Sequence, residues 1–217
     1  MEENNMKIHD ISGIIREGIW KYGPAYPDYR PVSTSAEPGK CFFEIFEGFN
    51  SQTGTYLETA AHVNGYEGNR LIADVDVSRL YNIPCRVLHV KPDGKKITAA
   101  HFEKAALGMT LPEGCALLID SGHDDWYEED FLTSAPWMTL DAMEWLLDKK
   151  PSLIGSDTPA WQKEEPVFDL FAPKDILLLA PLTGLSKTDG RNALLTVLPL
   201  NIEKTCCAPA RAVLVEE

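Results

Sequence analysis

Short apolar runs separated by turn-forming residues predict a domain built mainly from strands. Cys85–Val90 is rich in apolar residues typical of strands and stops at the turn cluster Lys91–Gly94. Cys115–Ile119 is apolar at every position, which is the pattern of a strand buried on both faces. Further strands are predicted at Lys7–Ile15, Cys41–Phe46, Ile176–Ala180, Ala193–Leu198 and Arg211–Val215.

Two segments carry helical signals. Thr98 is a candidate N-cap of a short helix that runs to about Leu107. Thr139 is a candidate N-cap of a second helix, which ends before Pro151. One face of this second helix is apolar: Leu140, Met143, Leu146 and Leu147. We therefore expect a single α/β domain over residues 1–217, with a mixed sheet and a few helices rather than a regular doubly wound fold.

Composition and charge narrow the class of partner. The 217 residues are 44% hydrophobic and 24% charged, which is typical of a soluble globular protein with a substantial core. The formal net charge of −13 argues against nucleic acid, because a polyanion needs Lys and Arg to displace its counterions. A small anionic ligand stays open, because a pocket can differ in sign from the whole protein.

The chain shows no signal for a membrane. No apolar run approaches the roughly 20 residues that span a bilayer. The first six residues are acidic and polar, without the basic and apolar regions of a signal peptide. We therefore expect a cytoplasmic protein with no membrane partner.

The five cysteines include no C-x-x-C motif, and their odd number and the apolar neighbours of Cys85 and Cys115 favour reduced thiols over a disulfide framework. The adjacent Cys206 and Cys207 have two interpretations, a redox-active pair or two residues of a loop that leads into a strand. The second interpretation is favoured.

One segment carries a recognisable motif. Gln52–His62 reads Q-T-G-T-Y-L-E-T-A-A-H and resembles the signature of the cyclase family of metal-dependent hydrolases, to which bacterial kynurenine formamidase belongs. That signature runs His-x-Gly-Thr-His-x-Asp-x-Pro-x-His. The chain matches it at Gly54, Thr55 and His62. It departs from the signature at Gln52, Tyr56, Glu58 and Ala60.

Further landmarks extend the resemblance over nearly the whole chain. The opening Ile11–Trp20 is similar to the family's beginning, where an aromatic residue after a Gly lines the substrate pocket. Four later segments resemble family landmarks in the same order: Leu117–Asp124, Ile154–Pro159, Leu198–Leu200 and Ala208–Val213. The resemblance implies the swivelling β/β/α fold of the cyclase and kynurenine formamidase type, usually as a homodimer or larger homo-oligomer.

In the family, one or two Zn²⁺ or Mn²⁺ ions are bound by the first two His and the Asp of the signature, together with a later His and Glu. Such a cation lowers the pKa of a bound water toward about 7 and creates the nucleophile. Here Gln52 and Tyr56 replace the two His, and Glu58 replaces the Asp. Ala180 stands at the place of the later Glu, and no His follows His123.

Of the five expected ligands, only Glu58 keeps a side chain that readily binds a cation. Glu58 and His62, with the weak amide oxygen of Gln52, fall short of the three or four protein ligands of a catalytic zinc site. We therefore expect no catalytic metal at Gln52–His62 and no other cofactor.

The remaining site residues suit acid–base chemistry and ligand binding. His62 is the candidate base, Glu58 the group that orients its ring, and Tyr56 a hydrogen-bond donor to a carbonyl or oxyanion. A lone His is as readily a structural residue, so this alternative stays open. The candidate substrate-binding residues are Trp20, Gln52, Thr55, His123 and Asp157. Tyr22, Tyr26 and Tyr29 form either a cover over the core or a wall of the ligand pocket.

Two hypotheses for function remain. The first is a cyclase-family hydrolase, or a derived lyase or isomerase, that acts on the C–N or C–O bond of a small carbonyl compound with His62 as base. The second is a non-catalytic ligand-binding or scaffold protein that kept the fold. Retention of His62 favours the first hypothesis, and loss of the metal ligands favours the second. Both predict a small-molecule ligand.

Overall fold

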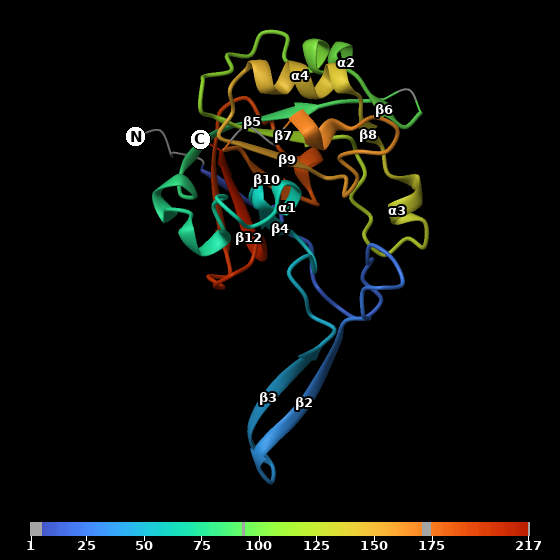
Figure 1. Ribbon diagram of the computed structural model, residues 1–217, viewed down its shortest axis with the longest axis vertical. Coiled ribbons are helices and arrows are strands. Elements are labelled where there is room, and N and C mark those ends of the chain that lie inside the picture. The colour runs from blue at the N-terminus through green and yellow to red at the C-terminus, as the bar shows by residue number, and fades with distance from the viewer. Residues whose placement is uncertain (1–5, 93, 171–174, 217) are drawn as a thin grey trace.

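The computed structural model describes residues 6–92, 94–170 and 175–216 (Figure 1). Residues 1–5 of the acidic start and Asp93 of the expected turn therefore lie outside the described residues. Eight of the described strands form the main sheet. They are β1 (Lys7–Asp10), β4 (Tyr56–Glu58), β5 (Ile83–His89), β7 (Ala116–Asp120), β9 (Leu153–Ser156), β10 (Leu177–Ala180), β11 (Ala193–Pro199) and β12 (Cys207–Glu216).

The main sheet closes on itself. Its strand order is β1-β12-β11-β5-β7-β9-β10-β4, and β4 also pairs with β12. The strands other than β1 therefore form a closed barrel, and β1 pairs with the far end of β12. Neighbours from β5 to β10 are parallel, whereas β4, β11 and β12 pair antiparallel. The fold is mixed α/β, as the sequence predicts, and the closure is an addition that the apolar pattern does not indicate.

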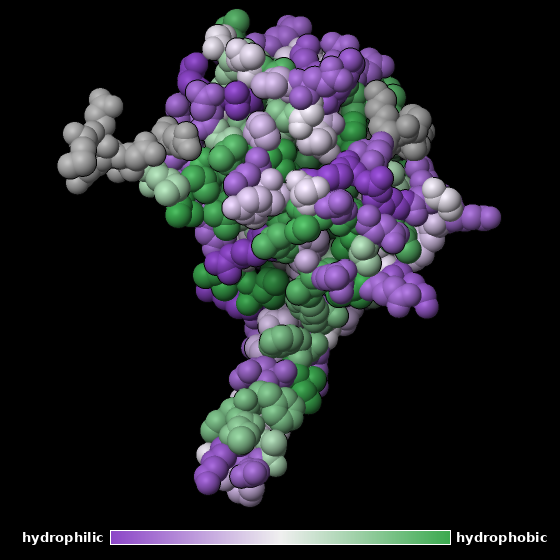
Figure 2. Space-filling model, turned by 90° about the vertical axis from the view of Figure 1, so that its left-hand side faces the viewer, coloured by the Kyte–Doolittle hydropathy of each residue, from purple (hydrophilic) through white to green (hydrophobic). Residues whose placement is uncertain are grey.

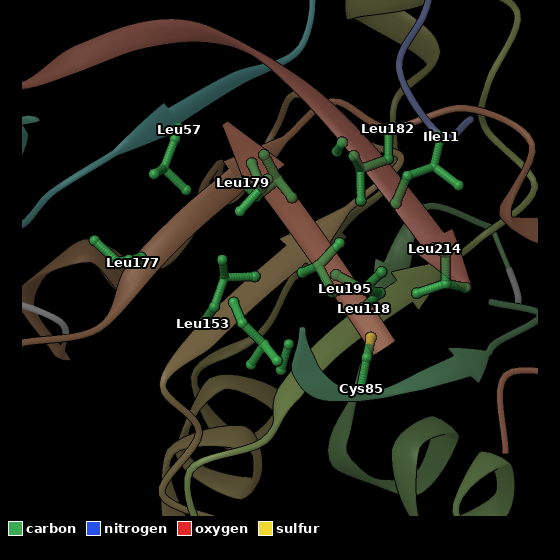
Figure 3. Packing of buried hydrophobic residues seen from close by; sticks show 14 of the residues in the cluster. Ile11, Leu57, Cys85, Leu118, Leu153, Leu177, Leu179, Leu182, Leu195 and Leu214 are labelled. Atoms are coloured by element: carbon green, nitrogen blue, oxygen red, sulfur yellow. The ribbon is translucent and has the colours of Figure 1, made fainter. Parts of the chain in front are cut away.

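The barrel interior is one of two cores. Leu118 of β7, Leu179 of β10 and Leu195 of β11 point toward one another inside the barrel (Figure 3). The other side chains of β7, Leu117 and Ile119, belong to the second core on the outer face. Because successive residues of a strand face opposite sides, burial of both faces explains why this strand is apolar throughout.

Two helices cover that outer face. α2 (Ala99–Ala105) and α4 (Leu140–Asp148) lie side by side over the parallel strands (Figure 1). Their N-caps are Thr98 and Thr139, which confirms both predicted helix starts. His101 is a structural residue here, since its Nδ1 accepts a hydrogen bond from the backbone N–H of Thr98 at 3.0 Å.

Apart from one projecting hairpin, the remaining elements are short. They are α1 (Ala61–Asn64), α3 (Phe131–Ser134), β6 (Lys96–Ile97), β8 (Trp137–Met138), and the 3₁₀ turns Ile72–Asp74, Val77–Arg79, Val167–Leu170 and Leu185–Lys187. No helix among the described residues has the length and apolar character needed to cross a membrane.

A two-stranded hairpin projects from the barrel (Figure 1). Its strands are β2 (Arg30–Glu37) and β3 (Lys40–Glu47), which pair antiparallel with each other. β3 confirms the strand expected at Cys41–Phe46, but the sequence does not predict β2. Apolar side chains lie along the hairpin surface (Figure 2), and the large ones are exposed: Phe42, Phe43, Ile45 and Phe46.

The first strand is shorter than the expected Lys7–Ile15. It ends at Asp10, and the backbone of Ile11 then bonds to two different segments. The N–H of Ile11 donates to the carbonyl of Ala212, and its carbonyl accepts from the N–H of Thr183. The chain leaves the sheet at this point, because it no longer pairs with a single neighbour.

Candidate functional site

A cavity of about 520 Å³ opens beside β4, a volume within the range of small-molecule sites. Aromatic side chains and a few polar groups make up most of its wall. The aromatic residues are Tyr22, Tyr26, Tyr56, Trp161 and Phe168. The polar residues are Gln52, Glu58, His62 and Gln162, and the rest are Leu132, Pro159 and Ala160.

Alternation along β4 selects the residues that face the cavity. Leu57 points into the barrel core, as Figure 3 shows, whereas Tyr56 and Glu58 line the cavity. The turn before this strand requires Gly54, whose φ is +76° and whose position leaves no room for a Cβ beside Ile15. α1 follows immediately and brings His62 to the same wall, with its Nε2 3.9 Å from Glu58 Oε2.

Tyrosine hydroxyls make hydrogen bonds at two of the signature positions, Tyr56 and Gln52. Tyr56 and Tyr22 share a hydrogen bond of 2.6 Å between their hydroxyl oxygens, and Tyr22 also donates to the carbonyl of Pro159 at 3.3 Å. Tyr26 donates to Gln52 Oε1 at 2.9 Å. Burial raises the pKa of Tyr22 and that of Tyr56 well above the usual range, so both phenols stay protonated.

Glu58 is a buried carboxyl with an incomplete set of partners. Its Oε2 lies 3.8 Å from the thiol of Cys207, and its Oε1 has no hydrogen-bond partner within the described part of the chain. Burial raises the pKa of Glu58 to about 8, and the contact with the thiol lowers it by less. His62 has 34% of its side chain exposed, and partial burial lowers its pKa. The imidazole is therefore neutral near pH 7.

Two thiols join this group. β12 begins at Cys207, which pairs with Glu58 across the β12–β4 ladder. His62 Nδ1 lies 3.4 Å from Cys207 Sγ and 3.8 Å from Cys206 Sγ. Burial and the nearby carboxyl raise the pKa of the Cys207 thiol. The spacing of the sequence gives no hint of this contact, because 144 residues separate Cys206 from His62.

The signature positions do not fit the metal set that the family resemblance implies. The oxygen of Gln52 accepts a hydrogen bond from Tyr26, and Tyr56 is a protonated phenol paired with Tyr22. Ala180 lies opposite Tyr56 in the β10–β4 pairing and offers no side-chain donor atom. Of the expected ligands only Glu58 keeps a side chain that can bind the ion, and one ligand is too few for a catalytic zinc or manganese site.

Two of the predicted substrate-binding residues support the cavity wall from behind. Trp20 is not part of the lining and packs edge-on against Tyr22, with 5.0 Å between ring centroids. Thr55 is buried, and its hydroxyl donates to the carbonyl of Pro181 at 2.7 Å. Gln52, in contrast, lines the cavity.

His123 and Asp157 lie together under the loop that follows β7. The backbone N–H of His123 donates to Asp157 Oδ2 at 2.9 Å, and the N–H of Ser121 donates to the same oxygen at 2.7 Å. The His123 ring stacks on Phe131, whose carbonyl its Nε2 approaches at 2.7 Å. Neither side chain belongs to the cavity lining, so this pair shapes the loop rather than the wall.

The aromatic loop divides between two roles. Tyr22 and Tyr26 line the cavity, so the interpretation as a pocket wall holds for these two. Tyr29 instead packs against Phe46 and Phe49 at the base of the hairpin, with ring centroids 6.2 Å and 6.4 Å away. Six lining residues are not predicted from the sequence: Leu132 of α3, Phe168 of the 3₁₀ turn Val167–Leu170, and Pro159, Ala160, Trp161 and Gln162 after β9.

Asp157 gives a pH-dependent prediction. Burial raises its pKa to about 7, above the value of about 3.9 in an unfolded chain, and the hydrogen bonds that it accepts lower it by less. Between about pH 4 and pH 7 the folded chain holds a proton that the unfolded chain has released, so this group lowers stability as pH rises. Replacing Asp157 with Asn should flatten this part of the profile by up to a few kcal/mol, roughly, in the free energy of unfolding.

Urea unfolding of wild type and Asp157→Asn from pH 4 to pH 8 measures the free energy of unfolding. The two proteins are compared by the slope of this free energy against pH, because the amide also loses hydrogen bonds. Asp148→Asn, which changes an exposed carboxyl, is the control. Parallel profiles for wild type and Asp157→Asn would contradict the prediction.

Comparisons with known proteins agree with this fold. A crystal structure of an isatin hydrolase bound to the product analogue thioisatinate superposes with a TM-score of 0.80 at 23% identity, covering 97% of this chain and 92% of that one. Isatin hydrolase A from Ralstonia solanacearum gives a TM-score of 0.80 at 18% identity, with 98% and 93% covered. A structure described as a potential metal-dependent hydrolase with cyclase activity gives 0.76 at 20% identity, with 98% of each chain covered.

The comparison with curated proteins gives no match. A family model described as "Putative cyclase" matches residues 9–163, which is more than half of the chain and includes the segment Gln52–His62. This match confirms the resemblance that the signature indicates. The chain belongs to the cyclase family that this model describes.

Proposed function

We propose that the protein is a hydrolase that cleaves the C–N or C–O bond of a small carbonyl compound held in the cavity. The observation that carries the proposal is the placement of Glu58 and His62 at one wall of an aromatic cavity. The fold supports it, because similar structures include isatin hydrolases. Stacking on Tyr22, Tyr26 and Trp161 favours a flat aromatic substrate.

The side chains supply proton transfer and carbonyl orientation. The neutral His62 accepts a proton from a water molecule through Nε2, and the water oxygen forms a bond with the substrate carbonyl carbon. The Tyr56–Tyr22 hydroxyl pair donates to the carbonyl oxygen, in place of the long bond from Tyr22 to Pro159. The C–N or C–O bond then breaks, the leaving atom takes the proton back, and a carboxylic acid is released.

A second function is favoured by the same wall. The oxygens of Gln52 and Tyr56 are held by tyrosines, so the family's metal set is replaced rather than rearranged. A protein that binds a small aromatic carbonyl compound without cleaving it would keep the cavity and need no nucleophile. In a hydrolase His62 is required for turnover, whereas in a binding protein it only contributes to the shape of the cavity wall.

Replacing His62 with Gln tests the hydrolase proposal. General-base catalysis contributes about 10²–10⁴-fold, so turnover should fall by about that factor while the fold persists. The assay follows hydrolysis of formyl-amides, lactones, imides and cyclic aromatic amides by chelator-treated protein. His89→Gln is the control, since His89 lies outside the cavity lining. If wild type and His62→Gln bind the same compound and neither cleaves any of the set, the hydrolase proposal fails and the binding function stands.

We also propose a homodimer or larger homo-oligomer that buries the β2–β3 hairpin. The residues Phe42, Phe43, Ile45 and Phe46 are 69%, 46%, 52% and 55% exposed. An isolated two-stranded hairpin is marginally stable in water, and exposed apolar surface of this kind marks an interaction site. A second copy of this chain is the partner that the family resemblance implies. Tyr29 links the hairpin base to the loop that lines the cavity.

Changing Phe43 and Ile45 together to Ser should convert the oligomer to a monomer. These two side chains lie on one face of β3, so the change removes apolar contact from one side of the hairpin. Light scattering at micromolar concentration measures the mass, and circular dichroism confirms folding. Leu107→Ser, at an exposed position just after α2 and outside the hairpin, is the control. A monomeric wild type would contradict the proposal.

A further inference from the structure

Cys206, Cys207 and His62 form a group whose ligand atoms all lie within 4.8 Å of one another. The two sulfurs are 3.6 Å apart, and His62 Nδ1 lies 3.8 Å and 3.4 Å from them. A disulfide would require about 2.05 Å between the sulfurs, so these are two free thiols. His62 comes from α1, Cys207 is the first residue of β12 and Cys206 precedes it, and the β4–β12 pairing brings these two segments together.

These separations match those of a tetrahedral metal site. With Zn–S near 2.3 Å and Zn–N near 2.0–2.1 Å, tetrahedral angles place two sulfurs about 3.8 Å apart and a sulfur and a nitrogen about 3.6 Å apart. Each of the three distances in the cluster lies within about 0.2 Å of these values. The group therefore needs little movement to hold one cation between its three ligand atoms.

Glu58 supplies a second and independent observation. The carboxyl is 2% exposed and contacts Cys207 Sγ, and its Oε1 has no partner within the described residues. No Lys or Arg of the described chain lies within ion-pair distance of this carboxyl, and its neighbour is the neutral ring of His62, with Nε2 3.9 Å from Oε2. The ionised form of a carboxyl buried at this position is costly unless a positive charge lies beside it. A cation between the thiols and the imidazole would supply that charge.

We propose that Cys206, Cys207 and His62 bind a divalent cation that prefers sulfur ligands, specifically Zn²⁺, with Glu58 as the adjacent carboxylate. Thiolate and imidazole ligands select zinc among the common divalent ions, and three protein ligands leave one position open. On binding, both thiols lose their protons to solvent and the sulfurs bond to the cation. Of the signature residues the ligand set includes His62, and it uses none of the replaced positions Gln52, Tyr56 and Glu58.

The proposal goes beyond the hydrolase function and does not depend on it. A cation on Nδ1 fixes the ring proton on Nε2, which faces Glu58, and metal-bound histidines commonly donate this proton to a carboxylate. His62 therefore cannot accept a proton from water while the cation is bound. Cation binding and base catalysis by His62 are alternative states of one side chain.

Binding of Co²⁺ and Zn²⁺ to the untagged, reduced and chelator-treated chain tests the proposal without any substrate. Co²⁺ should bind with one ion per chain and show the thiolate charge-transfer band and the strong visible absorption of a tetrahedral site. Zn²⁺ should then displace it. Affinity should fall more than about 100-fold in Cys206→Ser, and about 10–100-fold in Glu58→Gln, because loss of a ligand costs more than loss of its neighbour.

Cys41→Ser is the matched control, because it removes an exposed thiol from the hairpin and should leave binding unchanged. Cys206 is chosen over the buried Cys207 because its side chain is partly exposed, so the variant has the better prospect of folding. Equal Co²⁺ affinity for wild type and Cys206→Ser, or a spectrum without thiolate charge transfer, would overturn the proposal. Since the assay contains no substrate, absence of hydrolysis leaves its outcome unaffected.

Discussion

The pairing of β12 with β4 is the contact on which the rest of the structure depends. β4 has three residues and is hydrogen-bonded along both edges, to β10 on one side and β12 on the other. A strand of three residues makes few hydrogen bonds with any one neighbour, so its position depends on pairing with both β10 and β12. The same pairing sets Cys207 opposite Glu58. Closure of the barrel and assembly of the site therefore rely on one set of backbone hydrogen bonds.

Elements with a strong local pattern could be predicted from the sequence. Cys115–Ile119 is apolar throughout because both of its faces are buried, and the helix after Thr139 has one apolar face because only that face meets the sheet. Closure could not be predicted, because a three-residue strand is too short to show a period. β2 escaped prediction because Arg30–Glu37 is mostly polar and pairs only with β3, outside any core.

The residues of the candidate site also separate into those with a local sequence pattern, which could be predicted, and those without one, which could not. The signature spacing placed Gln52, Tyr56, Glu58 and His62 at one wall, because a strand and the turn after it fix their relative positions over a few residues. The contact of Cys207 with His62 depends on the register between segments 145 residues apart, which leaves no local trace. Loop aromatics such as Trp161 fit a core or a cavity equally well until the fold is known.

Alternation along β4 also restricts how such a site changes in evolution. Leu57 fills the barrel core while both of its neighbours face the cavity. Insertion or deletion of one residue here would exchange the two faces, moving a carboxyl into the apolar interior and a leucine into the cavity. Divergence is therefore confined to side-chain replacement on a backbone of constant length. A change of length in the projecting hairpin would leave this alternation and the barrel pairings in place.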